Sequence, residues 1–265
     1  LGGIPGLWTQ FDDSLSIREN ICRFVLQPHT YLQEEGLRSV AEELRETAVY
    51  HTILSSIASG RHKLNDLYRH TGFSRAKISV YLKNLMELEL VEKVFSYDTE
   101  GKANTQKGIY RISNHFVHFY FRFLYPNRSA LALKSANEFY EEHIQLSFKN
   151  FAATYFKEVC RQRIEKWDRE EKLPIEIDRI GEWVGKSGNI DVIAQDETGK
   201  TLVAYCNWEK SVMQYEDYEK LLLNIEKAKL GADTIYLFSI QRFDEKLSLE
   251  AKMKKNLKLI SLENM

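Results

Sequence analysis

The spacing of hydrophobic positions divides the chain into a helix-rich first part and a strand-rich last part. Apolar residues recur every three or four positions over 31–45, which predicts a helix with glutamates on its other face. Ser14 or Ser16 can cap an earlier helix that runs to about Leu26. The segment before residue 49 is therefore predicted to be helical.

A second and more specific pattern covers residues 49–113. The predicted elements are, in order, helices over 49–58, 64–68 and 74–85 and strands over 91–97 and 108–112. A turn at Gly72 precedes Ser74, which can cap the third helix. A polar loop, DTEGKANTQK, joins the two strands. This order of helices and hairpin is that of a winged helix-turn-helix.

The rest of the chain predicts an aromatic connector and a mixed α/β domain. Residues 114–125 read NHFVHFYFRFLY, Pro126 is expected to end that run, and a long helix follows over roughly 136–167. Beyond it we expect strands over 175–184, 190–193 and 202–208, a helix over 215–230 capped by Gly231, and strands over 234–240 and 257–260. A helix before a mixed sheet with a crossover helix is an α/β plan.

Composition narrows the class of protein. The 265 residues are 43% hydrophobic, which allows a sizeable core, and the net charge of −1 gives no whole-chain argument for nucleic acid. Three widely spaced cysteines suit a reducing cytoplasm better than a disulfide framework. No apolar run approaches the ~20 residues that cross a bilayer, so no membrane partner is expected. The first residue, Leu1, stands in a glycine-rich turn, which we interpret as part of a longer natural protein.

A local concentration of positive charge marks the predicted third helix of the 49–113 segment. Between residues 61 and 86 there are six basic residues and one acid, Asp66. The candidate nucleic-acid-binding residues are Arg61, Lys63, Arg75, Lys77, Ser79 and Lys83. Basic residues on a recognition helix contact DNA phosphates in and beside the major groove. The same fold also serves as a protein–protein module, so a partner interface is the alternative.

A candidate nuclease site lies on the hairpin at residues 188–208. In a PD-(D/E)XK nuclease, an Asp on one strand and Glu-x-Lys on the next hold Mg²⁺ and orient water. Asp191 matches the Asp, but Tyr205 and Asn207 stand at the Glu and Lys positions. A phenol with a pKa near ~10 does not replace a carboxylate ligand at neutral pH. Asp191 is therefore a vestigial catalytic residue, Tyr205 and Asn207 mark the degenerate positions, and no metal site is expected.

Four sequence motifs together resemble one family, which joins an archaeal-type P-loop ATPase module to a C-terminal domain of unknown function. They are LGGIP at 1–5, YHTILSSIASG at 50–60, YRISNHFVHFYFRFLYPNRS at 110–129, and IGEWVGKSGNIDVIA followed by VAYCNW. The resemblance covers the whole chain but only the C-terminal region of the family. It implies an α+β multidomain chain with a helical ATPase-lid remnant, a winged helix-turn-helix and a C-terminal α/β restriction-endonuclease-like domain.

The resemblance also implies domain bounds and partners. We expect the end of the ATPase lid at 1–48, the winged helix at 49–113, an aromatic helical connector at 114–140 and the nuclease-like domain at 141–265. ATP and Mg²⁺ are expected in an N-terminal module outside this chain, and the expected partners are DNA and that ATPase module. Three functions stay open: nucleic-acid association, a non-catalytic interaction scaffold, and an active metal-dependent nuclease.

An active nuclease would need a carboxylate and an amine from other sequence positions to replace the missing Glu and Lys. A migrated carboxylate could come from Glu176, Asp178, Glu182 or Glu209, and a migrated amine from Lys210. Two other motifs favour ordinary roles. Gly185-Lys186-Ser187 imitates the end of a Walker A loop, but Ile180 stands where its first glycine belongs. His115 and His118 have helical spacing within the aromatic run and are interpreted as core histidines.

Overall fold

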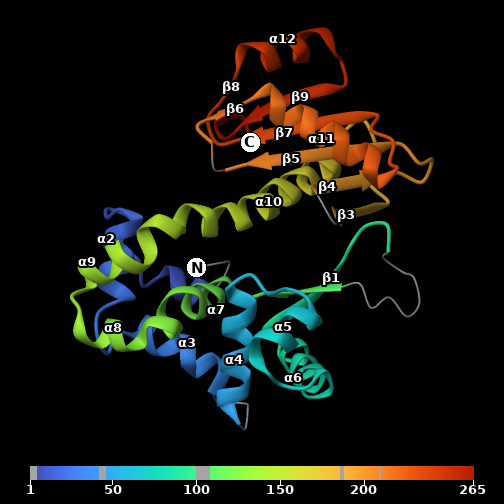
Figure 1. The fold of residues 1–265 in the computed structure, drawn as a ribbon. Helices are drawn as coiled ribbons and strands as arrows, with labels where there is room; N and C mark the ends of the chain where they lie inside the picture. Colours follow the sequence, from blue (N-terminus) through green and yellow to red (C-terminus); the bar gives the residue numbers. More distant parts are fainter. Residues whose placement is uncertain (1–4, 42–45, 100–107, 186–187, 209) are drawn as a thin grey trace. The chain divides into compact units, whose positions relative to one another are not determined.

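The computed structural model describes residues 5–41, 46–99, 108–185, 188–208 and 210–265. Their contacts form two compact units (Figure 1). Unit 1 comprises residues 1–94 and 108–146, and unit 2 comprises residues 95–107 and 147–265. The model is a mixed α/β structure, with helices dominating unit 1 and a mixed sheet at the centre of unit 2.

Unit 1 begins with helices and a small sheet. These are α1 (Pro5–Trp8), α2 (Ile17–Phe24), α3 (Tyr31–Ala41), α4 (Thr47–Ala58), α5 (Leu64–Thr71), α6 (Arg75–Glu87), β1 (Val91–Phe95) and β2 (Gly108–Ile112). Ser16 caps α2 in a capping box with Glu19, and Ser74 caps α6 by accepting from the Lys77 amide, so both expected caps are confirmed. The end of the helix expected to reach residue 45, and the loop at 100–107, lie outside the described residues.

The three helices α4, α5 and α6 share one hydrophobic core. Ile53 and Leu54 of α4 are fully buried, as is Leu67 of α5. On α6 an apolar stripe is buried, with exposures of 1% or less for Ile78, Leu82 and Leu85. Because these residues recur every three or four positions, they fix the rotation of α6 about its own axis. The two strands β1 and β2 that follow α6 pair as a two-stranded sheet.

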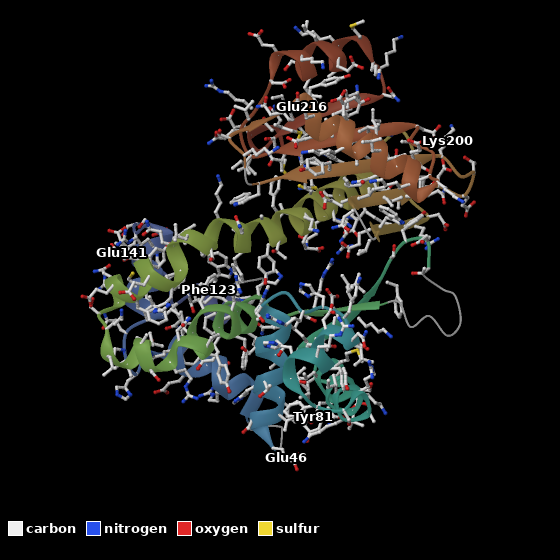
Figure 2. The ribbon with its side chains drawn as sticks, in the orientation of Figure 1. Glu46, Tyr81, Phe123, Glu141, Lys200 and Glu216 are labelled. Carbon is white, nitrogen blue, oxygen red and sulfur yellow. The ribbon has the colours of Figure 1, made fainter. Side chains whose placement is uncertain are left out.

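The aromatic segment folds into short, tightly packed helical turns. They are α7 (His115–Phe119), a π-helix (Tyr120–Leu124), a 3-10 turn (Tyr125–Asn127), α8 (Arg128–Leu133), α9 (Ala136–Phe139) and a second π-helix (Tyr140–Ile144). Phe121 and Phe123 are almost completely buried, and Phe119 packs on Phe123 with ring centroids 5.1 Å apart (Figure 2). Pro126 lies in the 3-10 turn, where its missing N–H breaks no helical hydrogen bond.

Unit 2 is a five-stranded sheet with helices. Its elements are α10 (Gln145–Arg169), β3 (Arg179–Val184), β4 (Asn189–Gln195), β5 (Thr201–Asn207), β6 (Val212–Met213), α11 (Tyr215–Ala228), β7 (Thr234–Ser239), β8 (Arg242–Phe243), α12 (Glu245–Met253), β9 (Leu257–Ser261) and a 3-10 turn (Leu262–Asn264). The sheet order is β3-β4-β5-β7-β9. The first three strands are antiparallel neighbours, whereas β5, β7 and β9 are parallel.

Each face of this sheet is covered by helices, which gives three layers (Figure 1). On one face, Cys160 and Ile164 of α10 pack with Val192 of β4. On the other, Leu221 of α11 and Leu247 of α12 pack with the opposite side chains of the same strands. Successive residues of a strand point to opposite faces, so β4, β5 and β7 contribute apolar side chains to both cores.

The structure differs from the sequence prediction at three places. The helix expected to end at Gly231 ends at Ala228, and Lys229 is its C-cap in the left-handed region at φ 57°. Gly231 as the cap was therefore wrong, because the Lys229 amide already bonds to the Ile225 and Glu226 carbonyls. Helix α12 and the short β6–β8 pair were not predicted. The strand expected from residue 175 begins at Arg179.

Residues 96–97, which follow β1, extend the edge of the unit 2 sheet. The Tyr97 amide donates to the Glu182 carbonyl (2.7 Å), and the Val184 amide donates to the Ser96 hydroxyl (3.0 Å). The Arg179 guanidinium lies 4.0 Å from the centre of the Tyr97 ring and bonds to the Tyr97 carbonyl. Tyr97, 4% exposed, is thus a core residue of unit 2.

Burial makes His118 a pH-sensitive residue of unit 1. Desolvation lowers the pKa of His118 from the ordinary 6.5 to about 4, helped by the nearby His62 and Arg122. The unfolded chain therefore binds one more proton than the folded chain between pH 6.5 and 4. Stability must fall as the pH is lowered through that interval.

We predict that folding stability drops by about 2 kcal/mol between pH 7.5 and 5 because of His118 alone. His118→Gln, which does not titrate, should lose that part of the pH dependence in urea unfolding. His29→Gln is the control, since the side chain of His29 is 93% exposed. Identical pH dependence for the parent and His118→Gln would show that His118 is not held neutral by burial.

Candidate functional site

The exposed face of α6 carries the basic residues that the sequence singled out. Arg75, Lys77, Ser79 and Lys83 are all exposed, as is Lys63, the N-cap of α5. Arg61 is half-buried, and its guanidinium donates to the Ser59 hydroxyl at 2.6 Å. The structure therefore places four of the six candidates on one helix, with Arg61 tied to the end of α4.

Neighbouring aromatic rings hold the cations at the start of α6. The Arg75 guanidinium lies 4.1 Å from the centre of the Tyr68 ring and donates to the Asn65 side chain at 2.6 Å. The Lys77 ammonium lies 5.0 Å from the Phe73 ring centre. Cations over aromatic faces are positioned without being neutralised. The first turns of α6 thus present fixed positive charge.

Acidic groups lie towards the other end of α6. Lys83 pairs with Glu87 one turn later, at 3.7 Å. Tyr81 donates a hydrogen bond to Glu46, which raises the pKa of Tyr81 to about 12, so the phenol stays neutral (Figure 2). The positive charge of the helix is accordingly strongest over its N-terminal half.

Asp191 lies at a β-bulge next to α10. Gly181 and Trp183 of β3 pair with Ile193 and Ile190 of β4, so β4 carries one extra residue at 191–192. A bulge redirects the side chains beside it. The Asp191 carboxylate lies 3.4 Å from the Lys157 ammonium of α10 and accepts from the Cys206 amide at 3.0 Å.

The electrostatics of Asp191 are those of a buried ion pair. Burial raises the pKa of Asp191, while Lys157 and the Cys206 amide lower it. Burial also raises the pKa of the neighbouring Cys206 thiol, and contact with Cys160 adds to the shift. Cys206 is therefore a neutral thiol and a poor nucleophile.

The two degenerate nuclease positions make different contacts. Tyr205 packs against the core beneath α11. The Asn207 side chain, 4% exposed, bonds to the backbone of Lys210 in both directions, at 3.1 Å each. Asp191 is contacted by α10 and by the β5 backbone instead. Asp191 and Asn207 are therefore held by different polar partners.

The candidates for a displaced catalytic group are scattered. Glu176 and Asp178 are exposed, and Glu209 lies outside the described residues. Glu182, on the strand next to β4, acts electrostatically on Asp191 and raises its pKa. Lys210 does not approach Asp191, because its ammonium pairs with Asp217 at 2.6 Å. Among the described residues, no three His, Cys, Asp or Glu side chains are grouped to hold a metal ion.

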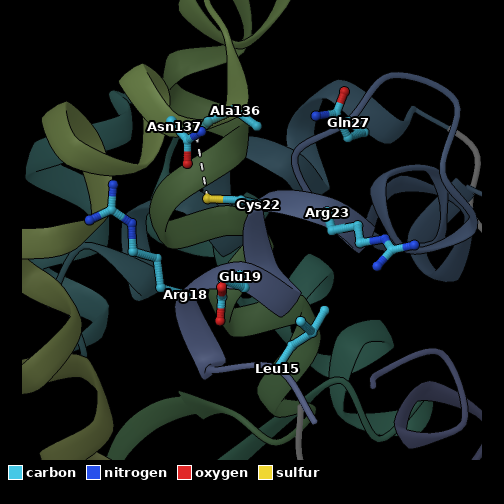
Figure 3. A pocket seen from close by; sticks show the side chains of 8 residues that line it. All are labelled: Leu15, Arg18, Glu19, Cys22, Arg23, Gln27, Ala136 and Asn137. Carbon is cyan, nitrogen blue, oxygen red and sulfur yellow. Dashed lines mark hydrogen bonds between the residues drawn. The ribbon is translucent and has the colours of Figure 1, made fainter. Parts of the chain in front are cut away.

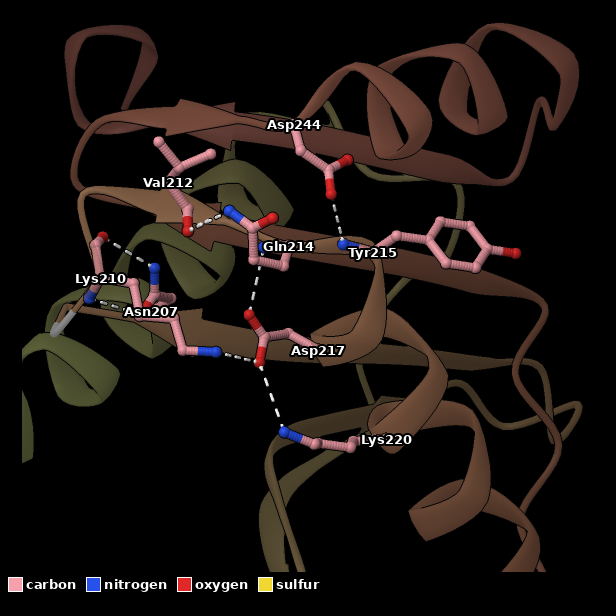
Figure 4. A network of polar contacts seen from close by, with 8 residues as sticks. All are labelled: Asn207, Lys210, Val212, Gln214, Tyr215, Asp217, Lys220 and Asp244. Atoms are coloured by element: carbon pink, nitrogen blue, oxygen red, sulfur yellow. Dashed lines mark hydrogen bonds and ion pairs between the residues drawn. The ribbon is translucent and has the colours of Figure 1, made fainter.

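A second polar network lies at the carboxyl ends of β5 and β7 (Figure 4). Its centre is Asp217, 3% exposed, which receives the Lys210 ammonium and the Gln214 amide (3.2 Å). Asp244 accepts from the Tyr215 amide at 2.8 Å. These bonds satisfy the start of α11, so the network holds that helix to the sheet.

Sequence reasoning missed Lys157 and Asp217. Lys157 is 34 positions from Asp191 and belongs to a different element, so no local spacing connects them. Asp217 carried a weak signal, because an acid at the third position of a helix commonly completes a capping box. Both residues neutralise or satisfy buried groups rather than form an open reactive centre.

A hollow of about 340 Å³ lies beside α2 in unit 1 (Figure 3). Arg18, on its wall, is paired with Glu141 at 2.6 Å, and Glu19 belongs to the capping box of α2. The Cys22 thiol donates to the Ala136 carbonyl at 3.7 Å, and burial raises its pKa. Arg18, Glu19 and Cys22 are therefore each engaged with a neighbouring residue of the protein.

Comparison with known families identifies two regions. Residues 120–221 match the family of Archaea bacterial proteins of unknown function. Residues 52–93 match the family of bacterial regulatory proteins of the arsR type, and this range covers most of α4, all of α5 and α6, and the start of β1. A helix-turn-helix domain is therefore indicated over these residues, and it is compatible with a DNA partner.

Individual relatives add little about function. An uncharacterized protein of Methanocaldococcus jannaschii is 30% identical over 190 residues, which is 71% of this chain and 42% of that protein. The chain thus spans less than half the length of this relative. The crystal structure of a Vibrio cholerae protein aligns with 87% of this chain and 51% of its own at 13% identity, with a TM-score of 0.29, too low to carry an argument. Among the described residues, no helix is long and apolar enough to cross a membrane.

The ion pair of Lys157 with Asp191 makes a testable contribution to stability. We predict that Lys157→Met costs roughly 2 kcal/mol in urea unfolding, because it leaves a buried carboxylate uncompensated. Adding Asp191→Asn should recover part of that loss in a double-mutant cycle. Lys166→Met is the matched control, since its surface pair with Glu170 should be worth less than about 1 kcal/mol. Equal losses in Lys157→Met and Lys166→Met would contradict this account.

Proposed function

We propose that the helix-turn-helix of unit 1 binds duplex DNA, with the exposed basic face of α6 as the contact surface. The observation that carries the proposal is the exposure of Arg75, Lys77 and Lys83 on one helix whose opposite face is buried. Cations held at fixed positions attract phosphates and release counterions from DNA. The match of residues 52–93 to a regulatory helix-turn-helix supports the same conclusion. Since phosphate contacts carry no sequence information, binding should be weak and only slightly selective.

The proposal for unit 2 is a degenerate, non-catalytic nuclease-like domain. The order of α10, the β3–β4–β5 meander, α11 and β7 places Asp191 and Asn207 on neighbouring strands, as the resemblance implies. Asp191 is neutralised by Lys157 rather than left open to a cation. One buried carboxylate with an ammonium already beside it is a poor ligand set for Mg²⁺, which needs several oxygen ligands.

An ATPase module outside residues 1–265 is the third part of the proposal. It rests on the resemblance of LGGIP to a lid motif, most of which lies at residues 1–4, outside the described part of the chain. ATP and Mg²⁺ are expected at that module, which would be a partner of the DNA-binding unit. Lys186 and Ser187, which imitate a Walker A loop, also lie outside the described residues.

We predict that replacing Arg75, Lys77 and Lys83 together by Ala removes most duplex binding at low salt. Three lost phosphate contacts should also reduce the slope of log affinity against log salt by about 3. The matched control, with Lys252, Lys255 and Lys258 replaced by Ala, removes the same charge from exposed positions in unit 2. Fluorescence anisotropy with a labelled duplex measures both quantities.

The outcomes separate the two interpretations of α6. Loss of binding in the α6 variant but not in the control supports DNA contact through this helix. If the α6 variant binds as well as the control, the proposed surface is wrong, and a protein-interaction role for α6 is favoured instead.

We predict that the chain cleaves neither DNA nor RNA in the presence of Mg²⁺ or Mn²⁺. Supercoiled plasmid and single-stranded RNA, incubated with the purified chain and resolved on gels, should stay intact at the level of an Asp191→Ala control. A nicking activity that is present in the parent and lost in Asp191→Ala would overturn the assignment of an inactive nuclease-like domain.

A further inference from the structure

The exposed face of α6 carries apolar as well as basic side chains. Val80 is 58% exposed in the middle of the helix, whereas Ile78, Leu82 and Leu85 are buried. Ala76, also exposed, lies one turn before it, so the two side chains share one face of the helix. Arg75 and Lys77 flank this pair at the start of the helix, and Lys83 follows it.

Isolated exposed valines are common and need no explanation. The position of Val80 is different, because the cations around it fit a polyanion. A polyanionic partner that also offers an apolar group to an inserted helix is duplex DNA, whose major groove exposes the C5-methyl group of thymine between two rows of phosphates. The basic residues around Val80 thus favour duplex DNA as the partner that binds this face of α6.

We assign base contacts to Ala76, Val80 and Ser79 rather than to Arg75. The Nε and Nη2 groups of Arg75 both donate to the Asn65 side chain, at 3.2 and 2.6 Å. One of the two guanidinium edges that can make paired hydrogen bonds to guanine is therefore engaged within the protein, and Arg75 retains its charge for phosphate contact. Recognition helices contact base edges mainly through their N-terminal residues, which here include Ala76 and Val80.

We infer that Val80, with Ala76 beside it, contacts thymine methyl groups in the major groove and gives the chain a modest preference for thymine. This inference rests on the proposed function, since it assigns a base-reading role to the same helix. Removing one methyl group that is buried on binding reduces the hydrophobic free energy of binding, and it should weaken the affinity about fourfold. The preference is therefore small beside the contribution of the phosphates.

The test uses two duplexes that differ in one chemical group. One contains thymine and the other deoxyuridine at every A·T pair, so phosphates and base pairing are the same and the C5-methyl groups are removed. Anisotropy titrations with the whole chain should show about fourfold weaker binding of the deoxyuridine duplex for each contacted methyl. Val80→Ala should bring the two affinities closer together, whereas Leu223→Ala, at a 54% exposed position on α11, should keep the parental ratio.

Each outcome has a distinct meaning. Equal binding of the two duplexes by the parent overturns the thymine inference and leaves DNA binding intact. A parental ratio in Val80→Ala shows that the methyl effect arises from DNA shape or from another residue, and overturns the assignment to Val80. Failure of the parent to bind either duplex overturns the proposed function and this inference with it.

Discussion

Burial of one apolar stripe on α6 is the constraint on which the candidate DNA interface depends. Ile78, Leu82 and Leu85 pack with α4 and α5, and this packing fixes the rotation of the helix. Once the rotation is fixed, the intervening residues must face solvent. The core beneath α6 determines which of its residues face solvent. The basic side chains are therefore exposed without a separate hydrogen-bond network to hold them there. The aromatic rings of Tyr68 and Phe73 then restrain Arg75 and Lys77 without cancelling their charge.

The pairing of buried charges also bears on the proposal that unit 2 is a degenerate, non-catalytic nuclease-like domain. A buried Asp191 needs a compensating group, and α10 supplies one in Lys157. Asn207, where an ammonium would be needed, turns back to the Lys210 backbone, and Lys210 itself pairs with Asp217. Asp191, Asn207 and Lys210 are thus each held by a structural partner. A carboxylate that is already paired with an ammonium is a poor start for a cation site.

The sequence predicted what local periodicity and capping determine. Ser16 and Ser74 caps, the α6 stripe and the hairpin with its turn at 196–200 follow from side-chain chemistry within a few residues. Contacts set by tertiary packing could not be predicted. The Lys157–Asp191 pair joins residues on separate elements, and Tyr97 becomes a core residue of unit 2 through pairing with Glu182. Helix α11 ends at Lys229 in a left-handed conformation, which glycine adopts most readily. The sequence rule for helix ends therefore pointed to the nearby Gly231 instead.

The central claim, that duplex DNA contacts the exposed basic face of α6, can be tested by lysine footprinting. The whole chain is acetylated with and without a saturating duplex, and modified lysines are quantified by mass spectrometry. This account predicts strong protection of Lys77 and Lys83, with no change at Lys220, whose side chain is 71% exposed in unit 2. Protection of Lys220 with unchanged modification of Lys77 and Lys83 would contradict it.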